Sequence, residues 1–362
     1  MVLVRQRKWG LKDKKVGPMK PTRLVFWNRI NRFSFNKMLV AALGSFALLL
    51  TAVPSNADSF GSGGNQFTLS FVPIGNAGNA NDTSNGSPGI GGVSYDYDMA
   101  FTAVSETMME DAATLSGFNL GTGSWTANQP MTNMSWYQAA AFVNWLNTSQ
   151  GYAAAYDLTY DGNTPIGITS WTGANVWVLG GTDYFRNANA HYFLPSENEW
   201  YKAAFYDPNK GGTGVGGYWT YATGSDTPPT PVLSGTDPGT AVYNQTNPQT
   251  AIGPAPVDQA GGLSPYGTIG QNGNVWEWTK TDYSDPTNST DGPRVCRGGD
   301  YDDNISSLPS SIRYGNGQPW QGMQTFGFRV ASVAAVPEPD STLLLGMGFL
   351  GAALIWRKRK AS

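Results

Sequence analysis

Signals for helix starts are rare in this chain, and their scarcity limits the folds that it can adopt. Two capping boxes are present: Ser135 is followed three residues later by Gln138, and Ser196 is followed by Glu199. In this pattern the two side chains satisfy backbone N–H groups that a helix start leaves without partners. Elsewhere, 45 glycines and 23 prolines interrupt regular structure along the 362 residues. We therefore expect an α+β fold with few regular elements and long loops.

Hydrophobic spacing supports both the helical and the strand parts of this expected fold. The helix expected after Ser135 presents a core-facing stripe, made of Trp136, Ala140, Val143 and Asn147 and widened by Ala139, Phe142 and Leu146. Short runs rich in aromatic and β-branched residues predict buried strands at Phe67–Val72, Val275–Thr279 and Phe328–Val333. Few other stretches of the chain predict regular structure.

Seven phrases, in a fixed order, resemble one known family. Three lie near the C-terminal end: Gly-Asn-Val-Trp-Glu-Trp at 273–278, Arg-Val-Cys-Arg-Gly-Gly at 294–299 and Gly-Phe-Arg-Val at 327–330. The others are Phe71–Ala80, Val93–Tyr97, Asn133–Ala140 and Tyr192–Trp200. Together they resemble the formylglycine-generating enzyme (sulfatase-modifying factor) family. The resemblance implies that family's variant of the C-type lectin fold.

The resemblance also predicts which reactive groups should be present, and these are missing. In the oxidases of the family, two cysteines after the Arg-Gly-Gly phrase hold copper and activate oxygen. Here Asp300–Phe326 contains no cysteine, and the only cysteine, Cys296, lies within a strand phrase where a small buried side chain is expected. His191 is the only histidine, which excludes a two-histidine iron site or a three-histidine zinc site within one chain. We therefore predict no catalytic residue, no bound organic cofactor and no copper.

Calcium is the one cofactor that the resemblance still permits. The family forms a structural calcium site around the Gly-Asn-Val-Trp-Glu-Trp phrase, and the matching positions here are Gly273, Val275 and Glu277. The family usually supplies a further Asp or Asn three residues earlier, where this chain has Gly270. One oxygen ligand is thereby lost from a site that prefers six to eight, although water or Asn272 could replace it.

The loop after the Arg-Gly-Gly phrase is the predicted ligand-binding segment. It mixes aromatic anchors with adaptable polar groups, as recognition loops do. The residues that we expect to contact a ligand are Tyr301, Asp302, Asp303, Asn304, Arg313, Tyr314 and Trp320. Sugar, peptide and protein ligands are all compatible with these side chains. The alternative is that the loop is an ordinary polar loop, retained from an enzyme ancestor.

The two ends of the chain resemble targeting segments. Residues 1–57 form a basic leader with an apolar run at Met38–Val53, and they end in the small residues that a signal peptidase reads. Residues 336–362 contain Pro337, Glu338 and Pro339, an apolar stretch at Ser341–Trp356 and four basic residues. This tail resembles a PEP-CTERM sorting signal, which implies an exosortase as partner, transient anchoring in the inner membrane and release to the envelope or extracellular matrix. A permanent single-span anchor is the alternative.

The domain between these ends, residues 58–335, is acidic, whereas the leader and the tail are basic. Residues 58–336 hold 8 basic and 23 acidic side chains, a net charge of about −15. Such a surface repels nucleic acid, which binds proteins that neutralise its phosphates. We predict an exported surface or matrix protein with a non-catalytic formylglycine-generating enzyme-like domain, ligand-binding or structural. The alternative is an oxidoreductase of the formylglycine-generating type that uses an atypical site.

Overall fold

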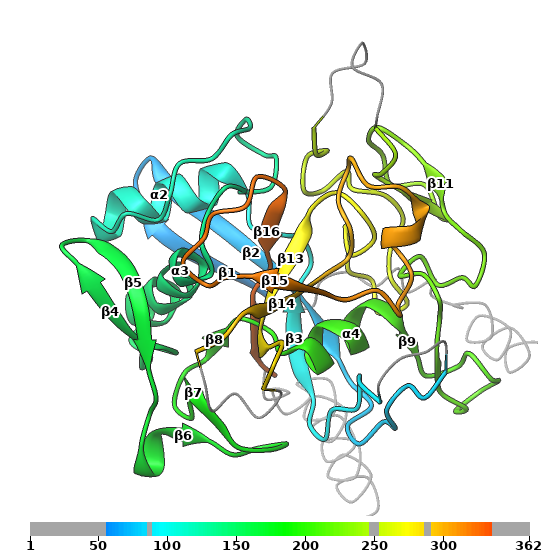
Figure 1. Ribbon diagram of the computed structural model, residues 1–362, viewed down its shortest axis with the longest axis horizontal. Coiled ribbons are helices and arrows are strands. Elements are labelled where there is room, and N and C mark those ends of the chain that lie inside the picture. The colour runs from blue at the N-terminus through cyan, green and yellow to red at the C-terminus, as the bar shows by residue number, and fades with distance from the viewer. Residues whose placement is uncertain (1–55, 85–88, 246–252, 286–290, 335–362) are drawn as a thin grey trace, which may run out of the picture. The chain divides into compact units, whose positions relative to one another are not determined.

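The computed structural model describes residues 56–84, 89–245, 253–285 and 291–334, and contains three α-helices and many short strands (Figure 1). The helices are α2 (Glu106–Ser116), α3 (Trp136–Ser149) and α4 (Glu197–Phe205). Two 3-10 helices, η1 (Gly173–Asn175) and η2 (Ile305–Ser307), add single turns. The expected α+β architecture is confirmed.

The strands belong to two larger sheets and four small pairs. The five-stranded sheet is ordered β1 (Asn56–Ser62), β2 (Asn65–Ile74), β3 (Tyr97–Ala100), β17 (Ala331–Val333) and β8 (Tyr192–Phe193), and the four-stranded sheet is ordered β15 (Tyr314–Gly317), β14 (Arg294–Arg297), β13 (Trp276–Asp282) and β16 (Phe326–Phe328). The pairs are β4 (Asp157–Asp161) with β5 (Thr164–Thr169), β6 (Val176–Trp177) with β7 (Asp183–Asn187), β9 (Tyr206–Asp207) with β10 (Gly217–Tyr218), and β11 (Thr230–Pro231) with β12 (Thr240–Ala241).

Both predicted helix starts are confirmed. The Ser135 and Ser196 side chains accept hydrogen bonds from the N3 backbone, and the Gln138 and Glu199 side chains reach back to complete the capping boxes. The whole predicted stripe of α3 is buried. Helix α2 was not expected, although Ser105 caps its start and Gly117 ends it in the left-handed conformation with φ 72°.

One predicted strand is wrong in its extent. The run Phe328–Val333 divides into β16, which pairs in parallel with β13, and β17, which pairs with β3 and β8 in the other sheet. The chain changes sheets at Arg329, whose guanidinium lies fully buried against Glu277. The ion pair therefore holds the two sheets together where the chain crosses between them.

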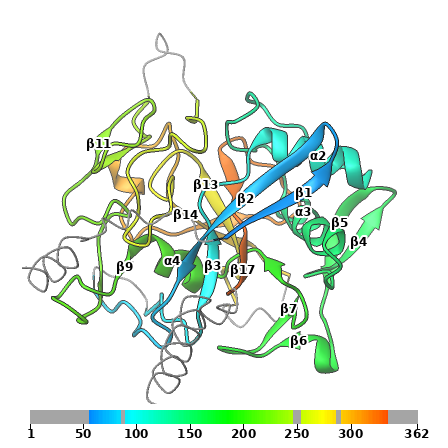
Figure 2. The same cartoon turned by 180° about the vertical axis from the view of Figure 1, so that it is seen from behind.

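The main core lies between α2, α3 and the two large sheets (Figures 1 and 2). Trp136 and Trp278 are fully buried in it, and the Phe142 ring meets Phe328 edge to face at 5.5 Å. Such large aromatic side chains contribute most of the buried apolar area of a core. This core and helix α4 support the loops that surround the candidate site described below.

Among the described residues, no helix is long and apolar enough to span a membrane. The apolar segments that we predict in the leader, Met38–Val53, and in the tail, Ser341–Trp356, lie outside these residues, as do Pro337, Glu338 and Pro339. Asn56 and Ala57, the last two residues of the predicted leader, belong to β1 and pair with β2.

Candidate functional site

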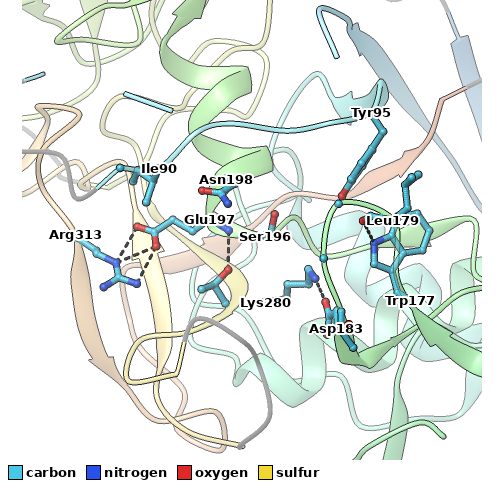
Figure 3. Close-up of a pocket in the computed structure, with 15 residues that line it drawn as sticks. Ile90, Tyr95, Trp177, Leu179, Asp183, Ser196, Glu197, Asn198, Lys280 and Arg313 are labelled. Carbon is cyan, nitrogen blue, oxygen red and sulfur yellow. Dashed lines mark hydrogen bonds and ion pairs between the residues drawn. The ribbon is translucent and has the colours of Figure 1, made fainter. Parts of the chain in front are cut away.

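A cavity of about 450 Å³ opens at the N-terminal end of α4 (Figure 3). We call it the α4 pocket. Its walls come from five segments: Gly89 to Tyr95, the hairpin β6–β7, the start of α4, the C-terminal end of β13, and the end of the loop that leads into β15. The lining residues are Gly89, Ile90, Tyr95, Trp177, Leu179, Gly180, Gly181, Thr182, Asp183, Ser196, Glu197, Asn198, Lys280, Thr281 and Arg313.

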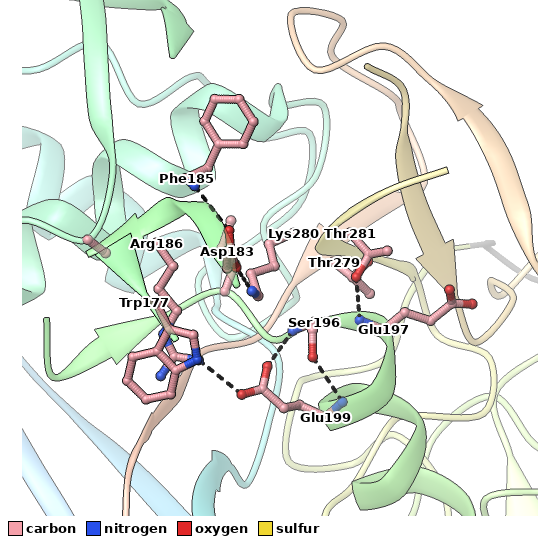
Figure 4. Close-up of polar contacts among 12 residues, drawn as sticks. Trp177, Asp183, Phe185, Arg186, Ser196, Glu197, Glu199, Thr279, Lys280 and Thr281 are labelled. Atoms are coloured by element: carbon pink, nitrogen blue, oxygen red, sulfur yellow. Dashed lines mark hydrogen bonds and ion pairs between the residues drawn. The ribbon is translucent and has the colours of Figure 1, made fainter. Parts of the chain in front are cut away.

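The Ser196 capping box places the first turn of α4 at this cavity. Ser196 Oγ accepts from the Glu199 backbone N–H at 3.2 Å, and Glu199 Oε2 accepts from the Ser196 N–H at 2.6 Å. The next orphan donor of the helix, the Glu197 N–H, donates to Thr281 Oγ1 of β13 at 2.8 Å (Figure 4). Helix and strand are thus tied together at the pocket floor.

Glu197 is held by two arginines from separate segments. Arg297 on β14 approaches its carboxylate at 2.6 Å, and Arg313 approaches it at 2.9 Å through both Nε and Nη2. Arg297 is buried and its Nη1 also donates to backbone carbonyls, whereas the Arg313 side chain is 23% exposed and lies over the Tyr283 ring. Bidentate contacts of this kind fix geometry as well as charge. Glu197 therefore keeps a defined orientation at the pocket wall.

A second ion pair lies across the pocket between Lys280 of β13 and Asp183 of β7 (Figures 3 and 4). Asp183 Oδ1 also accepts from the Phe185 N–H at 3.0 Å. Burial, and secondarily the positive charge of Arg294, lowers the pKa of Lys280 to about 7. Direct contact with the Asp183 carboxylate opposes this shift by favouring the ammonium form, so we assign the pair as ionic at neutral pH.

Aromatic rings form the remaining wall. Trp177 and Tyr95 meet edge to face at 5.7 Å. Behind them the Arg186 guanidinium lies between the rings of Trp177, at 3.5 Å, and Phe193, at 3.2 Å, and pairs with Glu199 at 3.1 Å. The Tyr95 hydroxyl donates to the same carboxylate at 2.6 Å, and burial followed by the charge of Glu199 raises the pKa of Tyr95. The wall is therefore rigid before any ligand arrives.

Of the seven residues predicted to contact a ligand, only Arg313 lines the α4 pocket. Tyr301 is buried and packs edge to face on Trp125, while Tyr314 packs on Trp276 and Phe326. Two of the remaining residues stabilise the local backbone: Asp303 accepts from the Asp300 N–H, and Asn304 caps η2. Asp302 is exposed, and Trp320 is 62% exposed near the start of α3. The loop therefore does not form one convergent surface, and ligand binding by all seven residues stays a prediction.

Of the three predicted calcium ligands, Glu277 is paired with an arginine. Both carboxylate oxygens of Glu277 face Arg329, at 2.6 Å from its Nε and Nη2, and Trp200 Nε1 also donates to Glu277 at 2.6 Å. The Gly273 carbonyl accepts from the Val275 N–H. Within the described residues, no three His, Cys, Asp or Glu side chains gather as a metal cluster would require. Glu277 fits hydrogen-bond donors better than a second cation, and calcium here stays a prediction.

Cys296 and His191 have structural surroundings. Cys296 is fully buried in β14, between the cross-strand neighbours Trp278 and Tyr314. Burial raises the pKa of the Cys296 thiol well above its ordinary value, and the charge of Glu197 adds to this effect. The His191 ring stacks on Tyr152 at 4.7 Å, and burial lowers the pKa of His191. The expectation that Cys296 is a buried strand residue is confirmed.

Sequence reasoning did not find most of the α4 pocket. Trp177, Asp183 and Lys280 stand in no motif, and their partners are distant in the chain. The usable signals were the Ser196 capping box, which marked the start of α4, and the Arg-Val-Cys-Arg-Gly-Gly phrase, which contains Arg297. Neither signal indicates which side chains meet across the cavity.

Comparisons with known proteins agree with this geometry. Residues 89–334 match the model of the sulfatase-modifying factor enzyme 1-like domain, and residues 335–360 match the PEP-CTERM protein-sorting motif. No curated protein matches the chain significantly.

Among solved structures, Treponema denticola variable protein 1 has 20% sequence identity and a TM-score of 0.51, over 77% of this chain and 99% of that one. The structure of CarF has 21% identity and a TM-score of 0.51, over 74% of this chain and 99% of that one. Both share the formylglycine-generating enzyme-like variant of the C-type lectin fold. The PEP-CTERM motif implies export and processing by an exosortase. The chain belongs to the sulfatase-modifying factor enzyme 1-like family and ends in a PEP-CTERM sorting motif.

Proposed function

We propose that the protein is sorted to the cell envelope or extracellular matrix and there binds a ligand in the α4 pocket without catalysing a reaction. The observation that carries this proposal is a polar, partly aromatic cavity whose side chains are fixed by ion pairs from separate elements. Pre-formed cavities of about 300–1,000 Å³ with a few convergent polar groups are typical of small-molecule sites. The volume of about 450 Å³ lies in this range.

A non-catalytic role is supported by the surroundings of the single cysteine. A thiol reacts or binds copper as the thiolate, and the raised pKa of Cys296 keeps it protonated at neutral pH. Copper(I) prefers soft sulfur ligands, and one chain offers only this cysteine sulfur at a position that is fully buried. Copper-dependent oxygen activation of the type found in the family's oxidases therefore has no evident centre here.

The alternative is an oxidoreductase with an atypical site, for which the α4 pocket is one candidate. The pKa of Lys280, lowered to about 7 by burial, is the observation in its favour, because perturbed pKa values often mark active sites. The contact with Asp183 argues for a structural ion pair instead. Copper-dependent oxidation of a cysteine peptide by the full chain distinguishes the two functions, since only the enzyme yields an aldehyde product.

The binding proposal is tested with the full chain in a detergent that carries no sugar headgroup. The panel contains glycans, peptides and secreted proteins. Leu179→Arg places a long charged side chain at the pocket mouth, where Leu179 is 52% exposed. Val178→Arg is the matched control, because Val178 is 69% exposed and does not line the cavity. Binding that Leu179→Arg abolishes and Val178→Arg retains supports the proposal. A panel without any pocket-dependent binder would refute it.

A further inference from the structure

We propose that the α4 pocket recognises a neutral saccharide unit, such as a hexose at the end of a longer chain. This inference rests on the proposed binding function and assigns the class of its ligand. It is carried by three properties of the lining: its charge balance, its remaining hydrogen-bonding capacity and its aromatic surface.

The charges that line the cavity cancel in pairs. Asp183 faces Lys280, and Glu197 faces Arg313, so two anionic and two cationic side chains line the pocket. An ionic ligand would have to compete with one of these pairs, and leaving one partner of a desolvated pair alone is costly. A neutral ligand leaves both pairs in place. The lining therefore disfavours charged ligands of either sign. This local balance differs from the domain as a whole, which carries a net charge of about −15.

The basic residues behind the lining show the same pattern. Five of the 8 basic side chains of residues 58–336 gather at the pocket and behind it, and each has an ion-pair partner among the carboxylates: Arg186 with Glu199, Lys280 with Asp183, Arg294 with Asp291, and Arg297 and Arg313 with Glu197. In a site for a phosphate or carboxylate ligand, we expect an arginine whose guanidinium is not already paired with a protein carboxylate and can bind the ligand. None of these five cations lacks a partner, which again favours a neutral ligand.

The hydroxyl groups of the lining can serve a polyhydroxylated ligand. Ser196 Oγ and Thr281 Oγ1 each accept a backbone N–H from the first turn of α4, so each still has its own O–H to donate. The carboxylate of Asp183 keeps further lone pairs, since an ionised carboxylate offers about four acceptor sites and only the Phe185 N–H and Lys280 contact it. Sugar hydroxyls both donate and accept, and they can use this alternation of donors and acceptors without any change in charge.

The aromatic wall suits the apolar face of a sugar ring. Trp177 lines the cavity, and its orientation is set by Arg186 stacked on the ring and by the Nε1–H bond to the Leu179 carbonyl at 2.7 Å (Figure 3). Tyr95 stands at its edge. Large rigid rings give contact area at low entropic cost. Together with the polar groups opposite, they form the apolar and polar sides that a pyranose presents.

The turn that carries Leu179 makes the pocket accessible to a blocking substitution. Gly180 has φ +77°, and a Cβ there would meet the Tyr95 ring at 2.7 Å, so the glycine allows the turn to pack against this wall. Leu179 itself is half exposed and lines the cavity, whereas the adjacent Val178 is exposed and does not line it. A change at 179 can therefore close the pocket without removing a core side chain.

The test measures binding of neutral hexoses and disaccharides by saturation-transfer NMR and calorimetry, with the full chain in the same detergent. A hexuronic acid, a phosphosugar and free amino acids are the charged comparison probes. We expect the neutral sugars to bind and Leu179→Arg to weaken them by roughly tenfold or more, or about 1.4 kcal/mol. Val178→Arg should bind as the unmodified chain does. Thermal melts of both variants show whether the fold is intact.

Each other outcome has a distinct meaning. Selective binding of the charged probes, or sugar binding that Leu179→Arg leaves unchanged, would overturn the saccharide assignment. Binding of peptides or proteins alone, lost in Leu179→Arg, would overturn it as well but leave the proposed binding function standing. Failure of every probe would remove both.

Discussion

The buried pair of Glu277 and Arg329 allows the sharpest test of how this fold is held together. Both side chains are fully buried, and the Glu277 carboxylate accepts two contacts from Arg329 and one from Trp200, all at 2.6 Å. Glu277→Gln keeps the size of the side chain and one acceptor oxygen, but removes the negative charge. Arg329 then remains a buried cation whose acceptors, one amide oxygen and backbone carbonyls, carry no charge.

Removing one partner of a buried ion pair typically costs about 3–5 kcal/mol. Whole domains are stable by only about 5–15 kcal/mol, so this loss is a large fraction of the total. At about 2–4 °C per kcal/mol for domains near this size, the melting temperature should fall by about 6–20 °C. Urea unfolding followed by circular dichroism gives the free energy directly.

A matched control comes from an exposed pair of the same domain. Lys210 and Asp226 lie 2.9 Å apart, with 22% and 53% of their side chains exposed. Asp226→Asn makes the same acid-to-amide change and should cost less than about 1 kcal/mol. If Glu277→Gln costs no more than Asp226→Asn, the burial argument is refuted.

The same assay tests the calcium prediction at Gly273, Val275 and Glu277. If Arg329 and Trp200 alone satisfy Glu277, a calcium chelator leaves the melting temperature unchanged. If calcium is bound there, the chelator lowers it, added calcium restores it, and Glu277→Gln removes this response because one ligand is lost. A chelator response that persists in Glu277→Gln would place any calcium elsewhere.

Three further outcomes are expected. Incubation of the full chain with copper and a sulfatase-type cysteine peptide should yield no formylglycine, because Cys296 is buried with a raised pKa; mass spectrometry of an aldehyde product would contradict this. Replacing the Pro-Glu-Pro tripeptide 337–339 by alanines should leave export intact but prevent processing of the tail, and fractionation with immunoblotting that finds a trimmed extracellular form would disprove the role of the tripeptide. Burial, opposed by a hydrogen bond from Thr325, raises the pKa of Asp300 from 3.8 to about 6. Because the folded state holds this proton more tightly, the stability it contributes is complete below pH 4 and is lost as the pH rises through 6. Between pH 4 and pH 7, the free energy of unfolding of Asp300→Asn should therefore rise by up to about 3 kcal/mol relative to that of the unmodified chain. If urea unfolding gives the same difference between the two proteins at both pH values, the prediction is wrong.

Features that depend on neighbours in the chain could be predicted from the sequence. A capping box needs only residues three positions apart, so Ser135 and Ser196 located the starts of α3 and α4. The strand phrase around Cys296 predicted a small buried side chain, and Cys296 is fully buried. Helix α2 was missed although its caps, Ser105 and Gly117, are local signals, because its hydrophobic pattern is weak and only Met109 and Ala112 among its apolar residues are buried.

Contacts between residues that are distant in the chain could be seen only in the folded protein. Arg313 reaches Glu197 across 116 positions, and Lys280 meets Asp183 only because β13 and β7 lie against the same end of α4. Ion pairs leave no periodicity in a sequence, since any acidic residue can pair with any basic one that the backbone brings within reach. The family, the starts of α3 and α4 and the absence of a second cysteine could all be read from the sequence. Only in the folded chain do five of the 8 basic residues of 58–336 gather at one pocket and pair with carboxylates, because burial makes an unpaired charge too costly to keep.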